Sequence, residues 1–359
     1  MIKVGIVGAS GWADSSHLPA LAGLDDFEVT AVATTNRAGA DRVAAAHGVP
    51  LAFTDAAELA EHPEVDLVVV SVRAAGHAAV IRAALAAGKH VLSEWPLGVD
   101  AAEAEQLARE AAAAGVAHAV NLQGVHSPDV RYVADLLAAG RIGRLQAAVL
   151  VAAGDPLGGP RIPPELAWST DPAGGTTLLT IMAGHFLAAL LRITGPLTEV
   201  TARVPHAHER VEVTGTGGSV PGGGAPSQVL LLGTLANGAV ASVTVHGGSG
   251  SPDGFLLRLV GTDGTLTATA PRPGSYPHWT DWEIRIDGEP APVPAHYRTV
   301  PFDPADGPVA NVAAGYREFA TALARHRAPA PDFHAAAAHH RLLAALERSA
   351  ATGTPQRVD

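Results

Sequence analysis

Short apolar runs alternate with longer helical stretches over the first third of the chain. The runs are rich in β-branched residues, and between them Ala, Leu and charged residues recur at helical spacing. We expect strands at residues 3–7, 29–34, 67–72, 90–93 and 118–122. A helix is predicted from Asp100, a favourable N-cap, to residue 114, just before Gly115. This alternation predicts βαβ units and a doubly wound parallel sheet.

From about residue 144 the pattern changes to alternating β-branched runs, several of them separated by glycine-rich turns. Such runs are typical of antiparallel strands, and Asn237-Gly238 between two of them is a strong hairpin signal. By composition, residues 215–227 are predicted to form a flexible surface loop. The expected strands cover residues 145–152, 198–204, 228–235, 239–246, 255–260, 265–270 and 282–286.

The composition of the chain limits the number of domains and the classes of function that are possible. A chain of 359 residues, 47% of them hydrophobic, is long enough for two folded domains. The net charge of −11 and the lack of a Lys/Arg-rich block argue against direct nucleic-acid binding. The chain contains no Cys, which excludes disulfides, thiol nucleophiles and Cys-ligated metal sites.

The amino-terminal residues read as a strand that enters a glycine turn, not as a secretory signal. No apolar stretch reaches the length of a membrane span without a charge, Gly or Pro. We therefore expect a cytoplasmic protein with no membrane association.

The turn after the first strand carries Gly5, Gly8 and Gly11. A glycine turn between a strand and a helix lets the backbone approach the pyrophosphate of a dinucleotide. Ser10 stands where the second glycine of the usual motif would be, and Gly11 follows one place later. The position of the turn favours dinucleotide binding, and the alternative is a tight turn with no ligand.

The end of the second strand bears on the choice between NAD and NADP. An acid normally stands there for NAD, whereas basic and hydroxyl groups suit the phosphate of NADP. This chain has Thr34, Thr35, Asn36 and Arg37 instead of an acid. The segment favours NADP over NAD, unless Arg37 is only a solvated loop charge.

Several short motifs follow one another along the chain. They are HLPAL after the first turn, the Glu94-Trp95-Pro96 triplet after a strand, and the segments at 71–77, 141–145, 174–185 and 332–353. Together they resemble the glucose-fructose oxidoreductase, inositol dehydrogenase and rhizopine-catabolism (Gfo/Idh/MocA) family, which has Glu-Lys-Pro at the triplet. The resemblance implies a Rossmann domain at 1–123 and an α/β domain at 124–359 with a large, mostly antiparallel open sheet. It also implies that helices within 311–351 pack back towards the first domain, and that the outer sheet face forms a homodimer or homotetramer.

Within the family, the chain is similar to the branch that contains the fungal galactose-regulon repressor. The residues that carry this likeness are Gly11-Trp12-Ala13, Glu94-Trp95, Leu122-Gln123-Gly124 with Ser127-Pro128, and Leu179-Thr180-Ile181 before Gly184-His185. That repressor resembles a dehydrogenase and acts through protein–protein contact.

Two departures from the dehydrogenase pattern affect the predicted chemistry. Trp95 replaces the family's Lys and cannot transfer a proton, and Ile181 stands where the family has an Asp. His185 then remains as the acid–base candidate, unless it is a helix-start histidine satisfied by backbone groups. Trp95 is expected either to form a flat wall against the nicotinamide or substrate, or to pack between domains.

The remaining candidates lie at the carboxyl ends of the Rossmann strands, where ligands bind. The resemblance places Glu94 near the nicotinamide ribose, while Arg73 is either a ligand contact or a surface charge. His126 and Tyr132 are further candidates. The expected cofactor-binding residues are Gly8, Ser10, Gly11, Trp12, Thr34, Thr35, Asn36, Arg37, Ser71, Arg73, His77, Glu94, Trp95, Pro96, Asn121 and Gln123.

The chain contains 17 histidines, but their spacing does not predict a metal site. His334, His339 and His340 are offset by intervals that do not put all three on one helix face. His206 and His208 are two residues apart and could lie on one face of a strand, but no third ligand is near them in the sequence. We expect no bound metal.

Three functions follow from these observations. The first is an oxidoreductase that prefers NADP and acts on a sugar-like or polyhydroxylated small molecule, with Trp95 and His185 in its site. The second is a dinucleotide-binding regulator that works through a protein partner. The third is a redox-neutral reaction, such as epimerisation or elimination, with a tightly held NAD(P).

Overall fold

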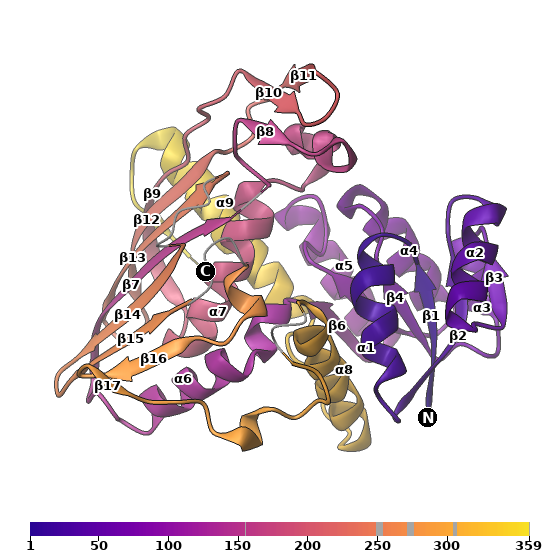
Figure 1. The fold of residues 1–359 in the computed structure, drawn as a ribbon, viewed down its shortest axis with the longest axis horizontal. Helices are drawn as coiled ribbons and strands as arrows, with labels where there is room; N and C mark the ends of the chain where they lie inside the picture. Colours follow the sequence, from indigo (N-terminus) through magenta and orange to yellow (C-terminus); the bar gives the residue numbers. More distant parts are fainter. Residues whose placement is uncertain (155, 249–253, 271–275, 304–306, 359) are drawn as a thin grey trace. The chain divides into compact units, whose positions relative to one another are not determined.

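The computed structural model describes residues 1–154, 156–248, 254–270, 276–303 and 307–358 (Figure 1). These residues form two compact units. Unit 1 comprises residues 1–123 and 300–340, and unit 2 comprises residues 124–299 and 341–359.

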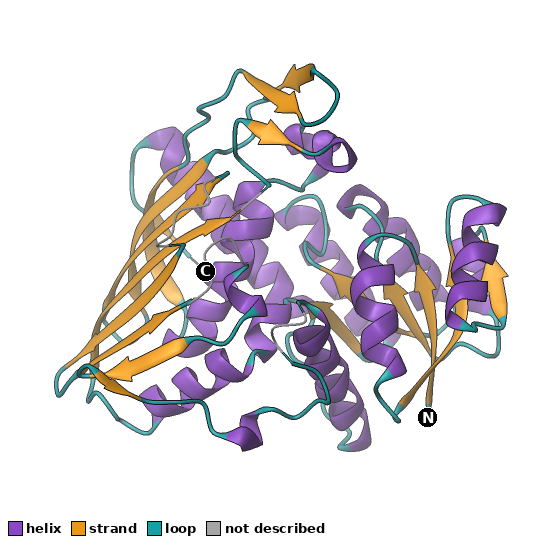
Figure 2. Ribbon diagram, viewed as in Figure 1, coloured by secondary structure: helices purple, strands orange, loops and turns teal. Residues whose placement is uncertain are grey.

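Unit 1 is built on one parallel sheet (Figure 2). Its strands are β1 (Ile2–Val7), β2 (Phe27–Ala33), β3 (Leu51–Phe53), β4 (Leu67–Val70), β5 (His90–Glu94) and β6 (His118–Asn121). Across residues 1–123, all of which are described, the strand order is β3-β2-β1-β4-β5-β6. In this doubly wound order, the chain changes direction between β1 and β4, and ligands bind at the carboxyl ends of the strands at such a point.

The predicted Rossmann strands are confirmed, and β3 was not predicted. Its three residues, Leu51–Phe53, are too few to show a periodic pattern. The strand forms because it pairs with Ala31–Ala33 of β2, a contact that no local pattern encodes.

Helices connect the strands of unit 1. They are α1 (Leu18–Ala22), α2 (Arg37–His47), α3 (Ala56–Glu61), α4 (Ala74–Ala86) and α5 (Ala101–Ala114), and a wide turn of π-helix, η1 (Ala13–His17), precedes α1. The carboxylate of Asp100 accepts a hydrogen bond from the Glu103 amide at 2.8 Å, and Gly115 ends α5 with a φ of 68°. The N-cap and C-cap signals that predicted this helix are therefore confirmed.

A helix from much later in the chain completes the core of unit 1. In α8 (Val309–Ala324), the side chains of Val312, Tyr316 and Phe319 are at most 1% exposed. They belong to the same buried cluster as Val4 and Ile6 of β1. Helix α9 (Phe333–Thr352) then runs from unit 1 into unit 2, the division falling after His340.

Unit 2 contains a large mixed sheet within its described residues. Its strands, in spatial order, are β17 (Glu289–Pro290), β16 (Glu283–Ile286), β15 (Thr265–Thr269), β14 (Phe255–Gly261), β7 (Leu145–Gly154), β13 (Val240–Gly247), β12 (Gln228–Leu235), β9 (Leu197–Arg203) and β18 (Gln356–Arg357). Neighbouring strands are antiparallel except β7 and β13. The predicted class, a Rossmann domain followed by an α/β domain with a large, mostly antiparallel sheet, is confirmed.

The hairpin predicted at Asn237-Gly238 joins β12 and β13. Gly238 has a φ of 85°, and the Asn237 side chain accepts a hydrogen bond from the Ala239 amide at 3.0 Å. The strands pair from Gln228 opposite His246 to Thr234 opposite Val240.

The prediction of a flexible loop over residues 215–227 is wrong for its first part. Strand β11 (Gly218–Pro221) pairs with β10 (Arg210–Val213), and β10 also pairs with β8 (Arg161–Ile162). Gly215 and Gly217, both with positive φ, form the turn before β11. The glycines therefore turn a hairpin instead of leaving the segment unstructured.

Helices α6 (Pro128–Ala138) and α7 (Gly184–Thr194) lie on one face of the large sheet (Figure 1). A π-helical segment, η5 (Leu178–Ala183), leads into α7. Short 3₁₀ turns are η2 (Gln123–His126), η3 (Pro164–Thr170), η4 (Pro172–Gly174), η6 (Pro277–Trp279) and η7 (Ala295–Tyr297). In the part of the chain that the structure describes, no helix has the length and apolar character needed to cross a membrane.

Candidate dinucleotide site and histidine cluster

The glycine turn after β1 lies against the end of β4. Gly8 has a φ of 85°, and a Cβ built on it would lie 2.4 Å from the backbone oxygen of Ser71. The Gly8 amide donates to the Ala33 carbonyl oxygen at 2.9 Å, which ties the turn to β2. Ser10 and Gly11 are exposed, and a Cβ on Gly11 would meet nothing within 4 Å. The turn is therefore closed on its inner side and open above Gly11.

These features fit a bound dinucleotide. The Ser71 hydroxyl oxygen is buried beside the turn and has no hydrogen-bond partner among the described residues. Such a group is normally satisfied by a ligand or water. Asp14, in ion pair with His47 at 2.6 Å, adds a negative charge to the helix that follows the turn. Despite the charge of Asp14, the open backbone at Gly11, the Ser71 hydroxyl and the strand order together form the arrangement in which a pyrophosphate is held.

The polar residues after β2 have local roles in the structure. The Asn36 side chain accepts a hydrogen bond from the Gly39 amide at 2.8 Å and so caps α2, and the Thr34 hydroxyl donates to the Asn36 carbonyl oxygen. Thr35 is exposed. Arg37 forms an ion pair with Asp41 at 2.9 Å, yet its side chain is 69% exposed. Arg37 is therefore paired along α2 while its guanidinium stays open to solvent.

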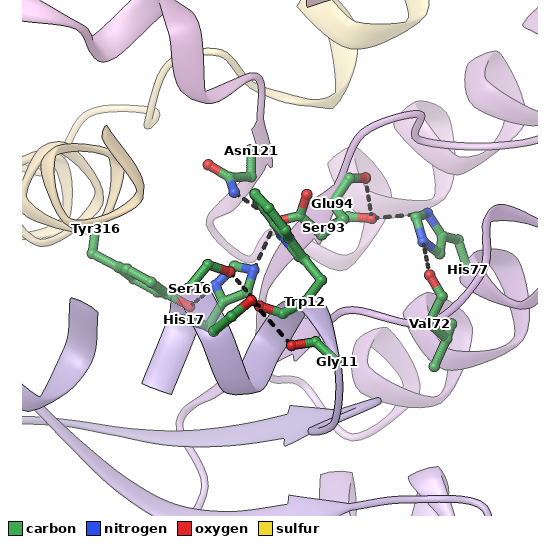
Figure 3. A network of polar contacts seen from close by, with 11 residues as sticks. Gly11, Trp12, Ser16, His17, Val72, His77, Ser93, Glu94, Asn121 and Tyr316 are labelled. Carbon is green, nitrogen blue, oxygen red and sulfur yellow. Dashed lines mark hydrogen bonds and ion pairs between the residues drawn. The ribbon is translucent and has the colours of Figure 1, made fainter. Parts of the chain in front are cut away.

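Glu94, at the end of β5, is the centre of a polar network (Figure 3). One of its carboxylate oxygens lies 2.7 Å from Nε2 of His17 and also accepts a hydrogen bond from the Asn121 amide. Nδ1 of His17 lies 2.7 Å from the hydroxyl oxygen of Tyr316 in α8. The structure thus brings together Trp12, Glu94 and Asn121, three of the predicted cofactor residues, around a histidine that the sequence did not single out.

The charge of Glu94 is governed by two opposing effects. Burial raises the pKa of Glu94, because a charged carboxylate loses its hydration. The hydrogen bond and the charge of His17, followed by the hydrogen bonds of Asn121 and Trp12, lower this pKa by more. The net shift is downward, so Glu94 is an ionised carboxylate at neutral pH.

Trp95 is buried and packs within unit 1. Its side chain is 4% exposed, and its ring centroid lies 5.0 Å from that of His339 and 4.5 Å from that of His340. Burial, followed by the charge of His339, lowers the pKa of His340 to about 3, so this imidazole is neutral. The peptide bond from Trp95 to the buried Pro96 is cis. The buried indole therefore packs against α9 through these two imidazole rings.

The other predicted residues of unit 1 differ in their surroundings. Arg73 is exposed at the start of α4, and Gln123 is buried. His77 is also buried, with Nε2 donating to the Val72 carbonyl oxygen at 3.0 Å and Nδ1 lying 3.4 Å from the Ser93 hydroxyl. Burial lowers the pKa of His77. His77 is therefore a neutral imidazole that connects α4 with Val72, which follows β4, and with Ser93 of β5.

In unit 2, His185 belongs to a cluster of aromatic and imidazole rings. It is 7% exposed on α7, and its ring centroid lies 6.5 Å from that of Tyr276. Burial, followed by the charge of His185, lowers the pKa of His278 to about 3. The Tyr276 hydroxyl is buried and has no hydrogen-bond partner among the described residues. His185 thus lies beside a neutral imidazole and an unused hydroxyl donor.

The candidates Tyr132 and His126 lie elsewhere in unit 2. The ring of Tyr132 packs against that of Tyr297 at 5.3 Å, and His126 is half-buried at the end of η2. Among the described residues, no group of three or more His, Asp or Glu side chains is arranged to hold a metal ion.

Sequence reasoning missed His17, Tyr316, Tyr276 and His278. His17 has a local signal in the sequence, because it follows the glycine turn and directly precedes an apolar helix. Tyr316 has none, since it follows His17 by 299 residues. The ring cluster around His185 likewise depends on contacts between α7 and the segment before β16.

Comparison with known families assigns both parts of the chain. Residues 2–122 match the oxidoreductase family with an NAD-binding Rossmann fold, Gfo/Idh/MocA. Residues 128–270 match the Gal80p C-terminal domain.

Curated relatives support these matches. A dTDP-3,4-didehydro-2,6-dideoxy-alpha-D-glucose 3-reductase of Streptomyces violaceoruber is 30% identical over 74% of this chain and 79% of its own length. The dehydrogenase aclE of Aspergillus oryzae is 34% identical over 58% of this chain. This second match spans 57% of that relative, which is less than two thirds of its length.

Solved structures show the same fold. A super-repressor mutant of Gal80p from Saccharomyces cerevisiae has a TM-score of 0.88 at 21% identity, covering 99% of this chain and 98% of that one. A levoglucosan dehydrogenase complex with NADH and levoglucosan has a TM-score of 0.87 at 19% identity, covering 99% of both chains. The Rossmann match, the Gal80p-like second domain and the reductase relative together establish that the chain belongs to the Gfo/Idh/MocA oxidoreductase family, in its Gal80-related branch.

Proposed function

We propose that this chain is an NAD(P)-dependent oxidoreductase that acts on a sugar-like or polyhydroxylated small molecule. The observation that carries the proposal is the open glycine turn at Gly8 and Gly11, at the edge of a Rossmann sheet. Beside it lies the Ser71 hydroxyl, for which the described part of the chain provides no hydrogen-bond partner. When bound, the nicotinamide supplies or accepts the hydride. The reductase and dehydrogenase names of the relatives support a sugar-like substrate.

In this proposal, the turn at Gly8, Ser10 and Gly11 holds the pyrophosphate, and Glu94 with Asn121 contacts the nicotinamide end of the dinucleotide. His185 gives a proton to the substrate oxygen or takes one from it. The neutral His278 beside it adds no competing positive charge. Trp95 contributes packing against α9, and its indole has no proton to transfer.

We favour NADP over NAD. The supporting observation is that residues 34–37 include no acid and that the Arg37 side chain is 69% exposed despite its pair with Asp41. To turn to a 2′-phosphate, this guanidinium would give up an exposed ion pair, which is worth about 0–1 kcal/mol. It would also give up the hydrogen bond that its Nη1 donates to the Ala52 carbonyl oxygen at 3.3 Å. Arg37→Ala should therefore weaken NADPH binding about tenfold or more and leave NADH binding unchanged within about twofold, as measured by calorimetry.

Turnover tests the catalytic assignment. The protein is incubated with NADPH and a panel of keto-sugars, imines and enones, and cofactor oxidation is followed by absorbance. His185→Ala should abolish turnover and keep dinucleotide affinity, whereas His206→Ala, which removes an exposed histidine of the same unit, should keep both. Failure of the wild type to bind either dinucleotide would reject the proposal.

A regulator is the second candidate, and the loss of two acid–base groups favours it. Trp95 and Ile181 stand where the family has Lys and Asp, and the second domain matches that of Gal80p. A regulator would bind the dinucleotide, oxidise none of it with any substrate of the panel, and bind a protein partner that NADP or a sugar releases. The third candidate, a redox-neutral epimerisation or elimination, would convert substrate with no net change in cofactor absorbance.

We also propose a cytoplasmic homodimer or homotetramer that contacts neither nucleic acid nor membrane. The large sheet exposes Leu230, Leu232 and Val240 by 38%, 64% and 57% on the face opposite its buried core residues. Exposed apolar side chains on a sheet are typical of a subunit contact. Light scattering after size-exclusion chromatography would give the mass, and a monomer would contradict this part of the proposal.

A further inference from the structure

His17 is fully buried, and both of its ring nitrogens are engaged by side chains from distant parts of the chain. Nε2 meets the Glu94 carboxylate at 2.7 Å, and Nδ1 meets the Tyr316 hydroxyl at 2.7 Å (Figure 3). Glu94 ends β5, while Tyr316 lies on α8. A core histidine needs only enough partners to satisfy its nitrogens, but this one directs a donor at a carboxylate on the ligand-binding edge of the sheet.

Glu94 needs such a partner in order to remain charged. Its side chain is 13% exposed, and burying a carboxylate favours the neutral acid unless hydrogen bonds and opposite charge compensate. The hydrogen bond to His17 is the strongest of the effects that lower the pKa of Glu94. Asn121 and Trp12 act in the same direction with smaller effects.

Tyr316 holds the imidazole in the orientation that serves Glu94. Burial raises the pKa of Tyr316 well above its ordinary value, so the phenol keeps its proton. The Tyr316 hydroxyl donates to Nδ1 when His17 is neutral, and its oxygen accepts from Nδ1 when His17 is protonated. In both states Nε2–H is left to donate to Glu94. The Tyr316 ring is itself fixed by an edge contact with Phe27, with centroids 5.3 Å apart.

We propose that His17, oriented by Tyr316, is a positioning residue that keeps Glu94 ionised and aimed so that it can accept hydrogen bonds from hydroxyl groups of the bound dinucleotide. This inference rests on the proposed function and extends it to two residues outside the predicted site. His17 acts through Glu94, and the glycine turn does not require it. Helix α8 then serves to orient the Glu94 carboxylate, which lies more than 200 residues earlier in the sequence.

Among the described residues, His17, Tyr316 and His77 are the titratable groups with an electrostatic interaction with Glu94. His17 is supplied by η1 and Tyr316 by α8, while His77 is supplied by α4. Burial lowers the pKa of His77, against a smaller opposing effect of the Glu94 charge. A neutral His77 adds no positive charge beside Glu94, so His17, followed by Asn121 and Trp12, stabilises the carboxylate.

The test measures the pKa of Glu94 and dinucleotide affinity separately. Carbon-13 NMR of protein labelled at the Glu carboxyl carbon follows the titration of Glu94, which Glu94→Gln assigns by loss of its signal. Calorimetry with NADPH and NADH gives the affinity from pH 5 to 8.

His17→Leu should raise the pKa of Glu94 by at least one unit and weaken dinucleotide binding at least tenfold, with the loss beginning at a higher pH than in the wild type. His17→Gln, which can still donate to Glu94, should restore part of both. Tyr316→Phe, which removes one hydroxyl, should shift the pKa of Glu94 in the same direction by less. The control is Tyr297→Phe in unit 2, which removes a hydroxyl bonded to Asp135 at 2.6 Å and should change neither readout.

An unchanged pKa of Glu94 or unchanged affinity in His17→Leu and Tyr316→Phe would overturn the inference while leaving the proposed function intact. If His17→Leu fails to fold, the Tyr316→Phe result decides. If the wild type binds no dinucleotide, the proposed function fails, and the inference fails with it.

Discussion

Two glycines of the same turn should respond differently to the same substitution. Alanine at Gly8 would adopt a φ of 85° and place its Cβ 2.4 Å from the Ser71 carbonyl oxygen and 2.9 Å from Cγ1 of Val72. The left-handed conformation costs about 1–2 kcal/mol for a residue with a Cβ. The overlap with a fixed backbone adds about 1–3 kcal/mol. Gly8→Ala should therefore lower the free energy of unfolding by about 2–5 kcal/mol.

Gly11→Ala is the matched control. Gly11 has a φ of 59°, and its added Cβ would meet nothing within 4 Å. Only the conformational term of about 1–2 kcal/mol applies. The new methyl group would lie in the open space assigned to the dinucleotide, so its affinity should fall about tenfold or more while most of the stability remains.

Urea denaturation followed by circular dichroism measures both stabilities, and calorimetry with NADPH measures the affinity of Gly11→Ala. Equal destabilisation by the two substitutions would refute the assignment of Gly8 as the closed side of the turn. Wild-type affinity in Gly11→Ala would refute the placement of the dinucleotide above Gly11.

Three further predictions concern buried groups. Burial raises the pKa of Asp129 from 3.8 to about 6, so between these values the folded protein holds a proton that the unfolded chain has already lost. Stability should therefore fall by about 2 kcal/mol as pH rises from 4 to 6. Asp129→Asn should remove this fall in urea denaturation at pH 4 and pH 7, and an unchanged pH dependence would contradict the assignment. Tyr276→Phe should stabilise the protein by about 1 kcal/mol, because it removes a buried hydroxyl that has no partner within the described ranges of the chain. A loss of stability would show that this hydroxyl is satisfied. Trp95→Lys, which restores the family's residue, should lower stability by at least about 3 kcal/mol and give no gain in turnover, because the ammonium would be buried against His339 and His340; a stable and more active variant would contradict the packing role.

Local patterns predict the elements of this fold well where each element carries its own signal. The helix from Ala101 to Ala114 has an Asp N-cap and a closing glycine, and the hairpin at Asn237-Gly238 has the residues that such a turn requires. Strands β3 and β11 lack a comparable pattern, because three or four residues become a strand only by pairing with β2 and β10.

The candidate site is likewise predictable from the sequence only in part. The glycine turn and the segment around Glu94 are visible as motifs with a known structural context. The surroundings of Trp95 are not, because its contacts His339 and His340 come from the far end of the chain. Neither the partners of His17 nor the neutral His278 beside His185 can be derived from spacing alone, since tertiary contacts create them.

The contribution of α8 to the core of unit 1 has a consequence for synthesis on the ribosome. His17 and Tyr316 are separated by 299 residues, so at about 5–20 residues per second Tyr316 is made roughly 15–60 s after His17. During this interval the nascent Rossmann segment lacks the apolar side chains of Val312, Tyr316 and Phe319 that close its core. The amino-terminal domain therefore completes its core only after α8 has been made, and until then it exposes the apolar surface that these side chains cover.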